Sequence, residues 1–178
     1  MRVILDLCSG SGAWSEPYRE GGYQVVRVTL PHNDVRQFRF LDWPVHGILA
    51  APPCTMFAVS GNRWPRTEAN MLEALSVVDA CLRMVAIYRP VWWALENPIG
   101  KLVNYLGSPA MYFDPCEYGD PYTKRTALWG TFQQPYKVNR VPALAGSAMH
   151  RLPPSPDRAA LRSVTPTGFA RAFFEANP

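Results

Sequence analysis

Short apolar runs alternate with amphipathic segments along this chain. The runs that predict strands are residues 3–7, 23–30, 47–51, 91–96 and 126–132. Residues 67–88 carry apolar side chains at spacings of one, three and four, which predicts the longest helix, and residues 168–176 predict a closing helix. This alternation predicts an α/β fold with a doubly wound, mostly parallel sheet, whose ligands bind at the carboxyl ends of the strands.

The length and composition indicate one globular domain. The chain has 178 residues, 48% of them hydrophobic, yet no apolar run approaches the roughly 20 residues of a membrane helix. The first run, which ends at Asp6, is also too short for a signal peptide. The four cysteines show no paired C-x-x-C spacing, so the sequence indicates neither a zinc site nor a disulfide framework. We therefore expect a cytoplasmic protein without membrane contact, and its net charge of +4 permits a polyanionic partner.

A turn with two glycines, DLCSGSG at residues 6–12, follows the first predicted strand. Glycine lets a backbone approach a bound cofactor closely, and a helix that starts behind the turn adds a favourable dipole. A plain tight turn is the alternative, because G-x-G alone is a weak signal.

A cysteine and a carboxylate follow two other predicted strands. Pro52 and Pro53 end the run at 47–51 and place Cys54 where α/β sheets bind ligands. Glu96 follows five apolar residues, so it must be paired, exposed at the sheet edge or functional. An isolated cysteine is often only a small hydrophobic side chain in a tight corner. Because Cys54 and Glu96 are expected at the same edge of the sheet, together they favour an active site.

Four motifs of this chain resemble those of the DNA cytosine-5 methyltransferases in order and approximate spacing. The motifs are DLCSGSG at 6–12, PCTMFAVSG at 53–61, ENP at 96–98 and YGDPYTKR at 118–125. In the family they correspond to a glycine loop, a nucleophile loop, a Glu-Asn pair and a basic segment. The resemblance implies a Rossmann-like methyltransferase fold. It also implies methyl transfer from S-adenosylmethionine to carbon 5 of cytosine in DNA, without a metal.

The resemblance implies a role for each matched residue. Cys54 would add to carbon 6 of cytosine as the nucleophile, and Glu96 would hold the exocyclic amine and protonate ring nitrogen 3. Arg125, with Lys124 beside it, would stabilise negative charge near the cytosine carbonyl oxygen, and a solvated basic turn is the alternative for that pair. The further candidates for substrate binding are Pro53, Asn97, Ser60 and Arg63.

The expected cofactor contacts come from three segments. The candidates are Asp6, Leu7, Cys8, Ser9, Gly10, Gly12, Thr29, Asp34, Val35 and Pro52. Cys8 stands where the family has a phenylalanine that contacts adenine, and Thr29 stands where an acidic residue holds the ribose hydroxyls. Asp34 better resembles the next family motif, near the adenine. These departures leave open a derivative of S-adenosylmethionine as the donor.

Residues 132–165 stand where sequence-reading members of the family carry a target-recognition domain. This Pro-rich segment is too short for a domain with its own core, so we expect a compact, phage-type member with a single catalytic domain at residues 1–178. Basic side chains that could contact a DNA backbone are Lys137, Arg140, His150, Arg151 and Arg158. We expect duplex or single-stranded DNA as the partner, and a monomer or small homo-oligomer in a bacterial or phage-infected cell.

Other functions remain open at this point. The same chemistry could act on a free cytosine nucleotide or use a modified S-adenosylmethionine, and the chain could be a catalytically inactive DNA-binding module. Retention of both Cys54 and Glu96 argues against the inactive module. A nicotinamide-dependent oxidoreductase is a distant alternative, because the glycine turn lacks the third glycine of that motif.

Overall fold

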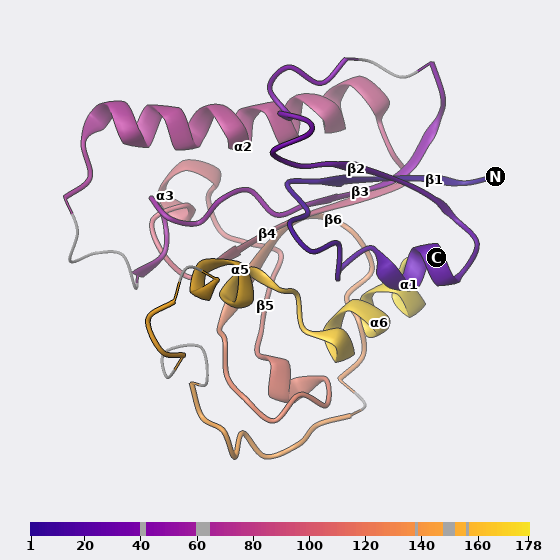
Figure 1. The fold of residues 1–178 in the computed structure, drawn as a ribbon. Coiled ribbons are helices and arrows are strands. Elements are labelled where there is room, and N and C mark those ends of the chain that lie inside the picture. The colour runs from indigo at the N-terminus through magenta and orange to yellow at the C-terminus, as the bar shows by residue number, and fades with distance from the viewer. Residues whose placement is uncertain (40–41, 60–64, 138, 148–151, 156) are drawn as a thin grey trace.

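A six-stranded sheet with helices on both faces forms the protein (Figure 1). The computed structural model describes residues 1–178 except residues 40–41, 60–64, 138, 148–151 and 156. The strands are β1 (Val3–Leu7), β2 (Gln24–Val28), β3 (Val45–Ala50), β4 (Trp92–Pro98), β5 (Met111–Phe113) and β6 (Thr126–Thr131). The helices are α1 (Glu16–Glu20), α2 (Glu68–Tyr88), α3 (Val103–Leu106), α5 (Arg158–Ser163) and α6 (Thr167–Ala176), with a 3-10 turn η2 at Pro115–Glu117.

The sheet is mixed, and its strand order is β2-β1-β3-β4-β6-β5. Strands β2, β1, β3 and β4 are parallel, whereas β6 runs antiparallel to β4, and β5 antiparallel to β6. Pro98 at the end of β4 pairs with Thr126 at the start of β6. The segment before β6 therefore meets the carboxyl ends of the parallel strands. The predicted α/β class with a mostly parallel sheet is confirmed.

Neighbouring strand residues alternate between two cores, as expected for side chains that point to opposite faces. Leu5 and Ile48 pack in the core beneath α2, while Ile4 and Leu49 pack in the core beneath α1 and α6. Figure 1 shows the same layers, with α2 on one face of the sheet and α1 and α6 on the other. This arrangement leaves the carboxyl edge of β1, β3 and β4 for loops and for α5.

Helix α2 begins and ends where local chemistry dictates. Thr67 Oγ1 accepts a hydrogen bond from Asn70 N at 3.2 Å, which satisfies one of the unpaired amide groups of the first turn. Arg89 adopts a left-handed conformation after the last turn, and Pro90 follows. The helix predicted over 67–88 thus starts one residue later than expected.

Several short elements were not predicted from the sequence. Helix α3, strand β5 and helix α5 each span six residues or fewer. Helix α5 lies within the Pro-rich segment 132–165. The described part of residues 142–156 contains no helix or strand.

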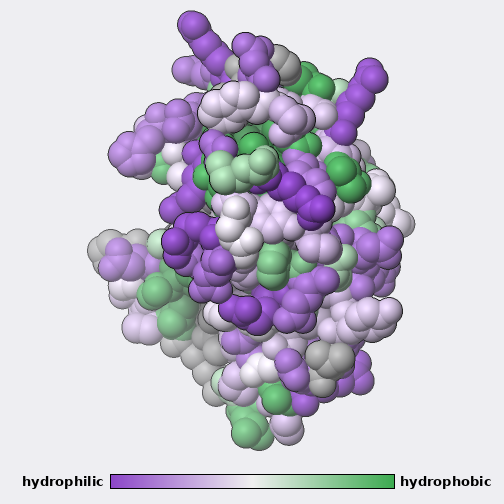
Figure 2. All heavy atoms as spheres, turned by 90° about the vertical axis from the view of Figure 1, so that its right-hand side faces the viewer, coloured by the Kyte–Doolittle hydropathy of each residue, from purple (hydrophilic) through white to green (hydrophobic). Residues whose placement is uncertain are grey.

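The edge opposite to the carboxyl ends of the strands has a predominantly polar surface. Figure 2 shows hydrophobic side chains there as small groups among hydrophilic ones. None of the helices in the described part of the chain has the length and apolar character needed to cross a membrane.

Candidate active site

The nucleophile loop leaves β3 through two prolines and turns sharply at Cys54. The carbonyl oxygen of Cys54 accepts hydrogen bonds from Phe57 N at 2.9 Å and from Ala58 N at 2.8 Å. These bonds close a turn that keeps Cys54 half-buried at the carboxyl edge of the sheet. The expected position of Cys54 after a buried strand is therefore the observed one.

The same loop is attached to the segment that follows β4. Val59 N donates to Ile99 O at 3.1 Å, and Lys101 N donates to Phe57 O at 2.8 Å. Gly100 lies between these bonds and pairs with Ala58 in an isolated β-bridge. These two hydrogen bonds, on either side of Gly100, hold the loop against the end of β4.

Glu96 and Asn97 lie near the end of β4, next to this loop. Ala50 of β3 pairs with Leu95 of β4, so Glu96 is one position further toward the carboxyl edge. Asn97 is fully buried, and its Nδ2 donates a hydrogen bond to Pro52 O at 2.9 Å. The structure thus brings together the motifs of Cys54 and Glu96, which are far apart in the sequence.

The charges around Cys54 and Glu96 influence both groups. Burial raises the pKa of the Cys54 thiol, the negative charge of Glu96 raises it further, and the positive charges of Lys124 and Arg162 lower it. Burial also raises the pKa of Glu96, against a smaller lowering by Lys124. Both side chains therefore tend toward their protonated forms, and Lys124 is close enough to influence each.

Lys124 and Arg125 point to different neighbours. Lys124 Nζ donates to Val164 O at 3.3 Å, and its backbone N–H donates to Asp114 Oδ1 at 3.0 Å. Arg125 Nη1 lies 3.3 Å from Asp114 Oδ2, and its guanidinium carbon lies 5.3 Å from the centre of the Tyr112 ring. Of the two predicted cations, Lys124 is the one whose charge influences the thiol. The substrate contact of Arg125 stays a prediction.

The glycine loop follows β1 in an unusual backbone conformation. Cys8, Gly10 and Gly12 have φ values of 57°, 50° and 78°, in the region that glycine adopts without strain. Cys8 N donates to Val28 O at 2.7 Å, which ties the loop to the end of β2. The loop therefore lies at the carboxyl edge, as predicted, and Leu7 beneath it is fully buried.

Asp6 is buried beneath this loop and supports it through Ser15. Its carboxylate accepts a short hydrogen bond from Ser15 Oγ, which also donates to Gly12 O at 3.1 Å. Asp6 is 1% exposed, and burial raises its pKa to about 7. Ser15 thus uses its hydroxyl on Asp6 and Gly12, and its side chain does not cap α1.

Three further predicted cofactor residues lie after β2, and Pro52 lies after β3. Val35 is buried in the core beneath α2, and Thr29 is half-buried. The carboxylate of Asp34 binds Arg36, with Nε 3.0 Å from Oδ1, and Arg36 lowers the pKa of Asp34. The cofactor contacts of these residues stay predictions.

Two cations near these loops were missed in the sequence. Arg27 on β2 donates to Ser9 Oγ at 3.2 Å and also to Gly10 O, so it lies against the glycine loop. Its only sequence signal was a charged position within a strand. Arg162 on α5 lies outside every motif. Its influence on Cys54 depends on how the chain folds back to the sheet, which the local sequence does not indicate.

Several predicted contacts cannot be located in the structure or have other partners. Ser60 and Arg63 lie outside the described residues, as do His150 and Arg151. Lys137 Nζ binds Glu117 Oε1 at 2.8 Å, and Arg140 lies 3.5 Å from the same oxygen. Among the described residues, His, Cys, Asp and Glu side chains do not gather in groups of three or more that could hold a metal ion.

Comparison with known proteins supports the resemblance deduced from the motifs. No protein-family model matches the chain. The chain is 26% identical over 122 residues to the type II methyltransferase M.DdeI of Desulfomicrobium norvegicum, a match that covers 56% of this chain and 28% of that protein. A solved structure, described as a DNA modification methyltransferase encoded within an E. coli prophage, has a TM-score of 0.53 and 18% identity, covering 74% of this chain and 47% of that one. The chain thus spans less than two thirds of either relative. Its resemblance to the DNA methyltransferases and its Rossmann-like α/β fold are confirmed.

Proposed function

We propose that this chain transfers a methyl group from S-adenosylmethionine to carbon 5 of cytosine in DNA, through a transient bond between Cys54 and carbon 6. The observation that carries the proposal is the convergence of Cys54 and Glu96. The Asn97–Pro52 hydrogen bond joins their two segments, and the charge of Glu96 raises the pKa of the thiol. The glycine loop lies at the same edge of the sheet.

Cys54 supplies the nucleophile. Carbon 5 of cytosine is too weak a nucleophile to accept a methyl group unaided. A thiolate that adds to carbon 6 pushes electron density toward carbon 5. When a base later removes the proton from carbon 5, elimination releases Cys54 as a thiolate and restores the aromatic ring. We assign no residue to that base.

Glu96 supplies the proton that makes this addition possible. Addition of a thiolate leaves negative charge on the ring, which protonation of nitrogen 3 neutralises. The carboxyl group must then be protonated when substrate binds. Burial raises the pKa of Glu96 in the direction that this role requires.

Lys124 balances the charges of these two groups. Its positive charge lowers the pKa of both Cys54 and Glu96. A cation beside the cytosine carbonyl oxygen would also stabilise the negative charge that forms on the ring. We infer this role for Lys124, whose backbone N–H donates to Asp114 Oδ1, and Arg125 follows it in the sequence.

The residues of the carboxyl edge fit S-adenosylmethionine. The loop is open above Gly10, where an added methyl group would approach only Ser163 Oγ, at 3.8 Å, whereas the Arg27 guanidinium covers Gly12, where an added methyl group would lie 2.8 Å from it. Ser9 within this loop, together with Thr29, Asp34, Val35 and Pro52, would complete the site. The bound cofactor supplies a methyl group on a positively charged sulfur, which a nucleophilic carbon can attack.

DNA is the acceptor that the comparisons favour. The solved structure with the same fold is described as a DNA modification methyltransferase, and the net charge of this chain is +4. A cytosine within duplex DNA must leave the base stack to reach Cys54, which costs a few kcal/mol. We therefore infer that single-stranded or mismatched sites are the better substrates.

A trapping experiment tests the proposed function. The protein is incubated with S-adenosylmethionine and an oligonucleotide that contains 5-fluorocytosine, and its intact mass is measured. Fluorine at carbon 5 cannot leave as a proton, so the enzyme should gain the mass of the oligonucleotide plus one methyl group. Cys54→Ala should give no adduct, whereas Cys116→Ala, a half-buried cysteine in η2, should be trapped like the wild type.

The absence of an adduct on both single-stranded and duplex DNA would overturn DNA as the acceptor. Free cytosine nucleotides and modified donors would then be tried in the same assay. Adduct formation by Cys54→Ala would overturn the assignment of the nucleophile.

A further inference from the structure

Helix α5 lies against the candidate active site through contacts with two of its parts. A methyl group built at Gly10 would lie 3.8 Å from Ser163 Oγ, so the end of α5 is close to the glycine loop. Lys124 Nζ donates to Val164 O, directly after α5, at 3.3 Å. Arg162 on the same helix influences Cys54 through its charge. The two contacts reach the glycine loop and the basic segment, and the charge of Arg162 acts on Cys54 in the nucleophile loop.

We propose that α5 forms a wall of the candidate active site, and that Arg162 is the positioning residue it contributes, with a positive charge that favours the thiolate of Cys54. This inference rests on the proposed function, because it takes Cys54 as the nucleophile. A thiolate is the form that adds to carbon 6, and a nearby guanidinium stabilises it relative to the thiol.

The need for such a charge follows from the other groups around Cys54. Burial and the carboxyl group of Glu96 on β4 both disfavour the thiolate. Lys124 and Arg162 favour it, from the segment before β6 and from α5. Arg125 is engaged with Asp114 and with the ring of Tyr112 instead. Arg162 therefore provides, together with Lys124, a second positive charge that acts on Cys54.

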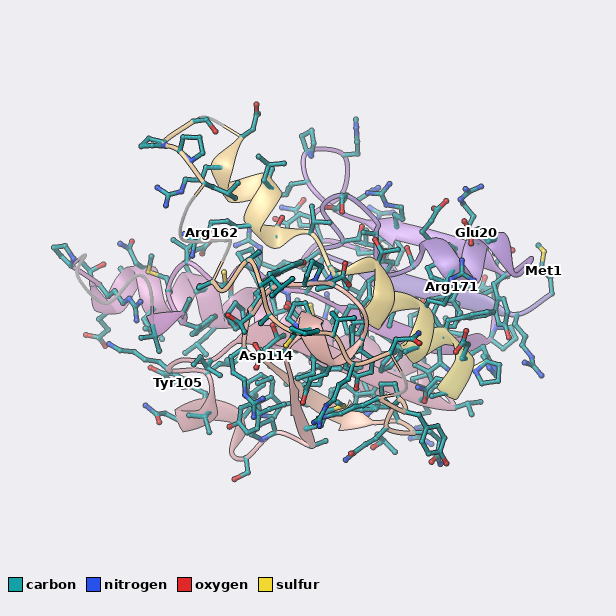
Figure 3. The ribbon with its side chains drawn as sticks, turned by 90° about the horizontal axis from the view of Figure 1, so that it is seen from below. Met1, Glu20, Tyr105, Asp114, Arg162 and Arg171 are labelled. Carbon is teal, nitrogen blue, oxygen red and sulfur yellow. The ribbon has the colours of Figure 1, made fainter. Side chains whose placement is uncertain are left out.

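The backbone of this segment also controls the other cation. Val164, whose carbonyl oxygen accepts from Lys124 Nζ, is two residues after Arg162. A displacement of α5 would therefore move Arg162 away from Cys54 and release Lys124 at the same time. Figure 3 shows Arg162 on α5 in the same half of the molecule as Asp114, away from the Glu20–Arg171 pair that joins α1 to α6.

The test measures Cys54 itself, in the protein without DNA or cofactor. The rate at which iodoacetamide alkylates Cys54 is followed against pH, and peptide mass spectrometry separates Cys54 from the other cysteines. The inflection of this profile should move to higher pH in Arg162→Gln and further in Arg162→Glu, because the positive charge is removed and then reversed. Arg162→Lys should stay near the wild type, since it keeps the charge.

The control is Arg171→Gln, which removes an exposed arginine at the other end of the molecule and should leave the profile unchanged. Circular dichroism establishes that each variant is folded. A structural role for Arg162 would affect the lysine and glutamine variants alike, so equal profiles for these two would overturn the proposal. An unchanged profile in folded Arg162→Glu would do the same.

This readout separates the inference from the proposed function. A charge-graded shift together with failed trapping on DNA would retain Arg162 as a positioning residue of Cys54 and reject cytosine in DNA as the acceptor. Successful trapping without a shift would retain the proposed function and reject the role of Arg162.

Discussion

Asn97 Nδ2 donates a hydrogen bond to the carbonyl oxygen of Pro52 at 2.9 Å, and this bond joins the segments that carry Glu96 and Cys54. Asn97 is fully buried at the end of β4, while Pro52 is the first proline after β3. Proline has no N–H, so Pro52 cannot take part in the sheet as a donor, but its carbonyl oxygen still needs a partner. The side chain of Asn97 provides that partner, and with it sets the spacing of the two motifs.

Replacement of Asn97 by alanine should therefore damage both stability and activity. The change leaves Pro52 O without its partner in a buried site, which costs about 1–3 kcal/mol in the free energy of unfolding. Urea unfolding measures this loss, and the trapping rate with 5-fluorocytosine DNA should fall as well. Asn104→Ala on the exposed side of α3 is the matched control and should change neither. A stable Asn97→Ala with an unchanged trapping rate would show that the bond does not position Cys54.

The pKa of Cys54 should respond in opposite directions to its two close charged neighbours. Glu96→Gln removes a negative charge that raises the pKa of the thiol, so the alkylation profile of Cys54 should move to lower pH. Lys124→Gln removes a positive charge that lowers this pKa, so the profile should move to higher pH. Glu20→Gln, at the far end of the molecule, is the control for a change of net charge. Shifts of the same sign in both variants would contradict the assigned geometry.

The stability of the protein should depend on pH through Asp6. Burial raises the pKa of Asp6 from its ordinary value of 3.8 to about 7 in the folded protein. The folded state therefore binds this proton more tightly than the unfolded state does. The stabilisation of the fold by the protonated Asp6 is complete below about pH 4 and is lost as the pH rises toward about 7. Asp6→Asn does not titrate, so its stability relative to the wild type should rise over this range, by up to about 4 kcal/mol.

Chemical unfolding of both proteins at several pH values measures that difference. Asp34→Asn provides a comparison of opposite sign, because Arg36 lowers the pKa of Asp34 in the folded protein. The wild type should therefore gain stability relative to Asp34→Asn as the pH rises through the acid range. A constant difference between the wild type and Asp6→Asn from pH 4 to pH 8 would mean that Asp6 does not take up a proton on folding.

Gly100 should be intolerant of any side chain. A methyl group built there would lie 2.0 Å from Phe57 O, the acceptor that fixes the nucleophile loop to the segment after β4. Gly100→Ala should push this loop away, with a loss of about 1–3 kcal/mol in stability and a lower trapping rate. Gly22→Ala meets no neighbouring atom and lies after α1, so it should lose some stability through its positive φ but keep its trapping rate.

Much of the fold follows from local pattern. The apolar runs 3–7 and 126–132 became strands within one residue of the expected bounds, because a buried strand in such a sheet needs hydrophobic side chains on both faces. The three residues of β5 have no comparable pattern, since their strand conformation depends on pairing with β6. Helix α5 was missed for a similar reason, because its six residues lie in a Pro-rich segment and gain their position from tertiary contacts.

The candidate site could be predicted only in part from the sequence. Cys54 and Glu96 could be placed, because parallel strands bring their carboxyl ends to one edge. The side chains that surround them could not. Neither the orientation of Arg125 toward Asp114 nor the approach of Arg162 has a counterpart in local sequence, because each depends on a partner remote from its motif.

Identification of the methylated base is the most direct measurement of the proposed chemistry. The protein is incubated with DNA and S-adenosylmethionine that carries a deuterated methyl group, and the DNA is digested to nucleosides for mass spectrometry. We predict labelled 5-methyldeoxycytidine with the wild type and none with Cys54→Ala. Label on an exocyclic amine of cytosine or adenine, or equal label with Cys54→Ala, would contradict attack by Cys54 on carbon 6 as the basis of this protein's function.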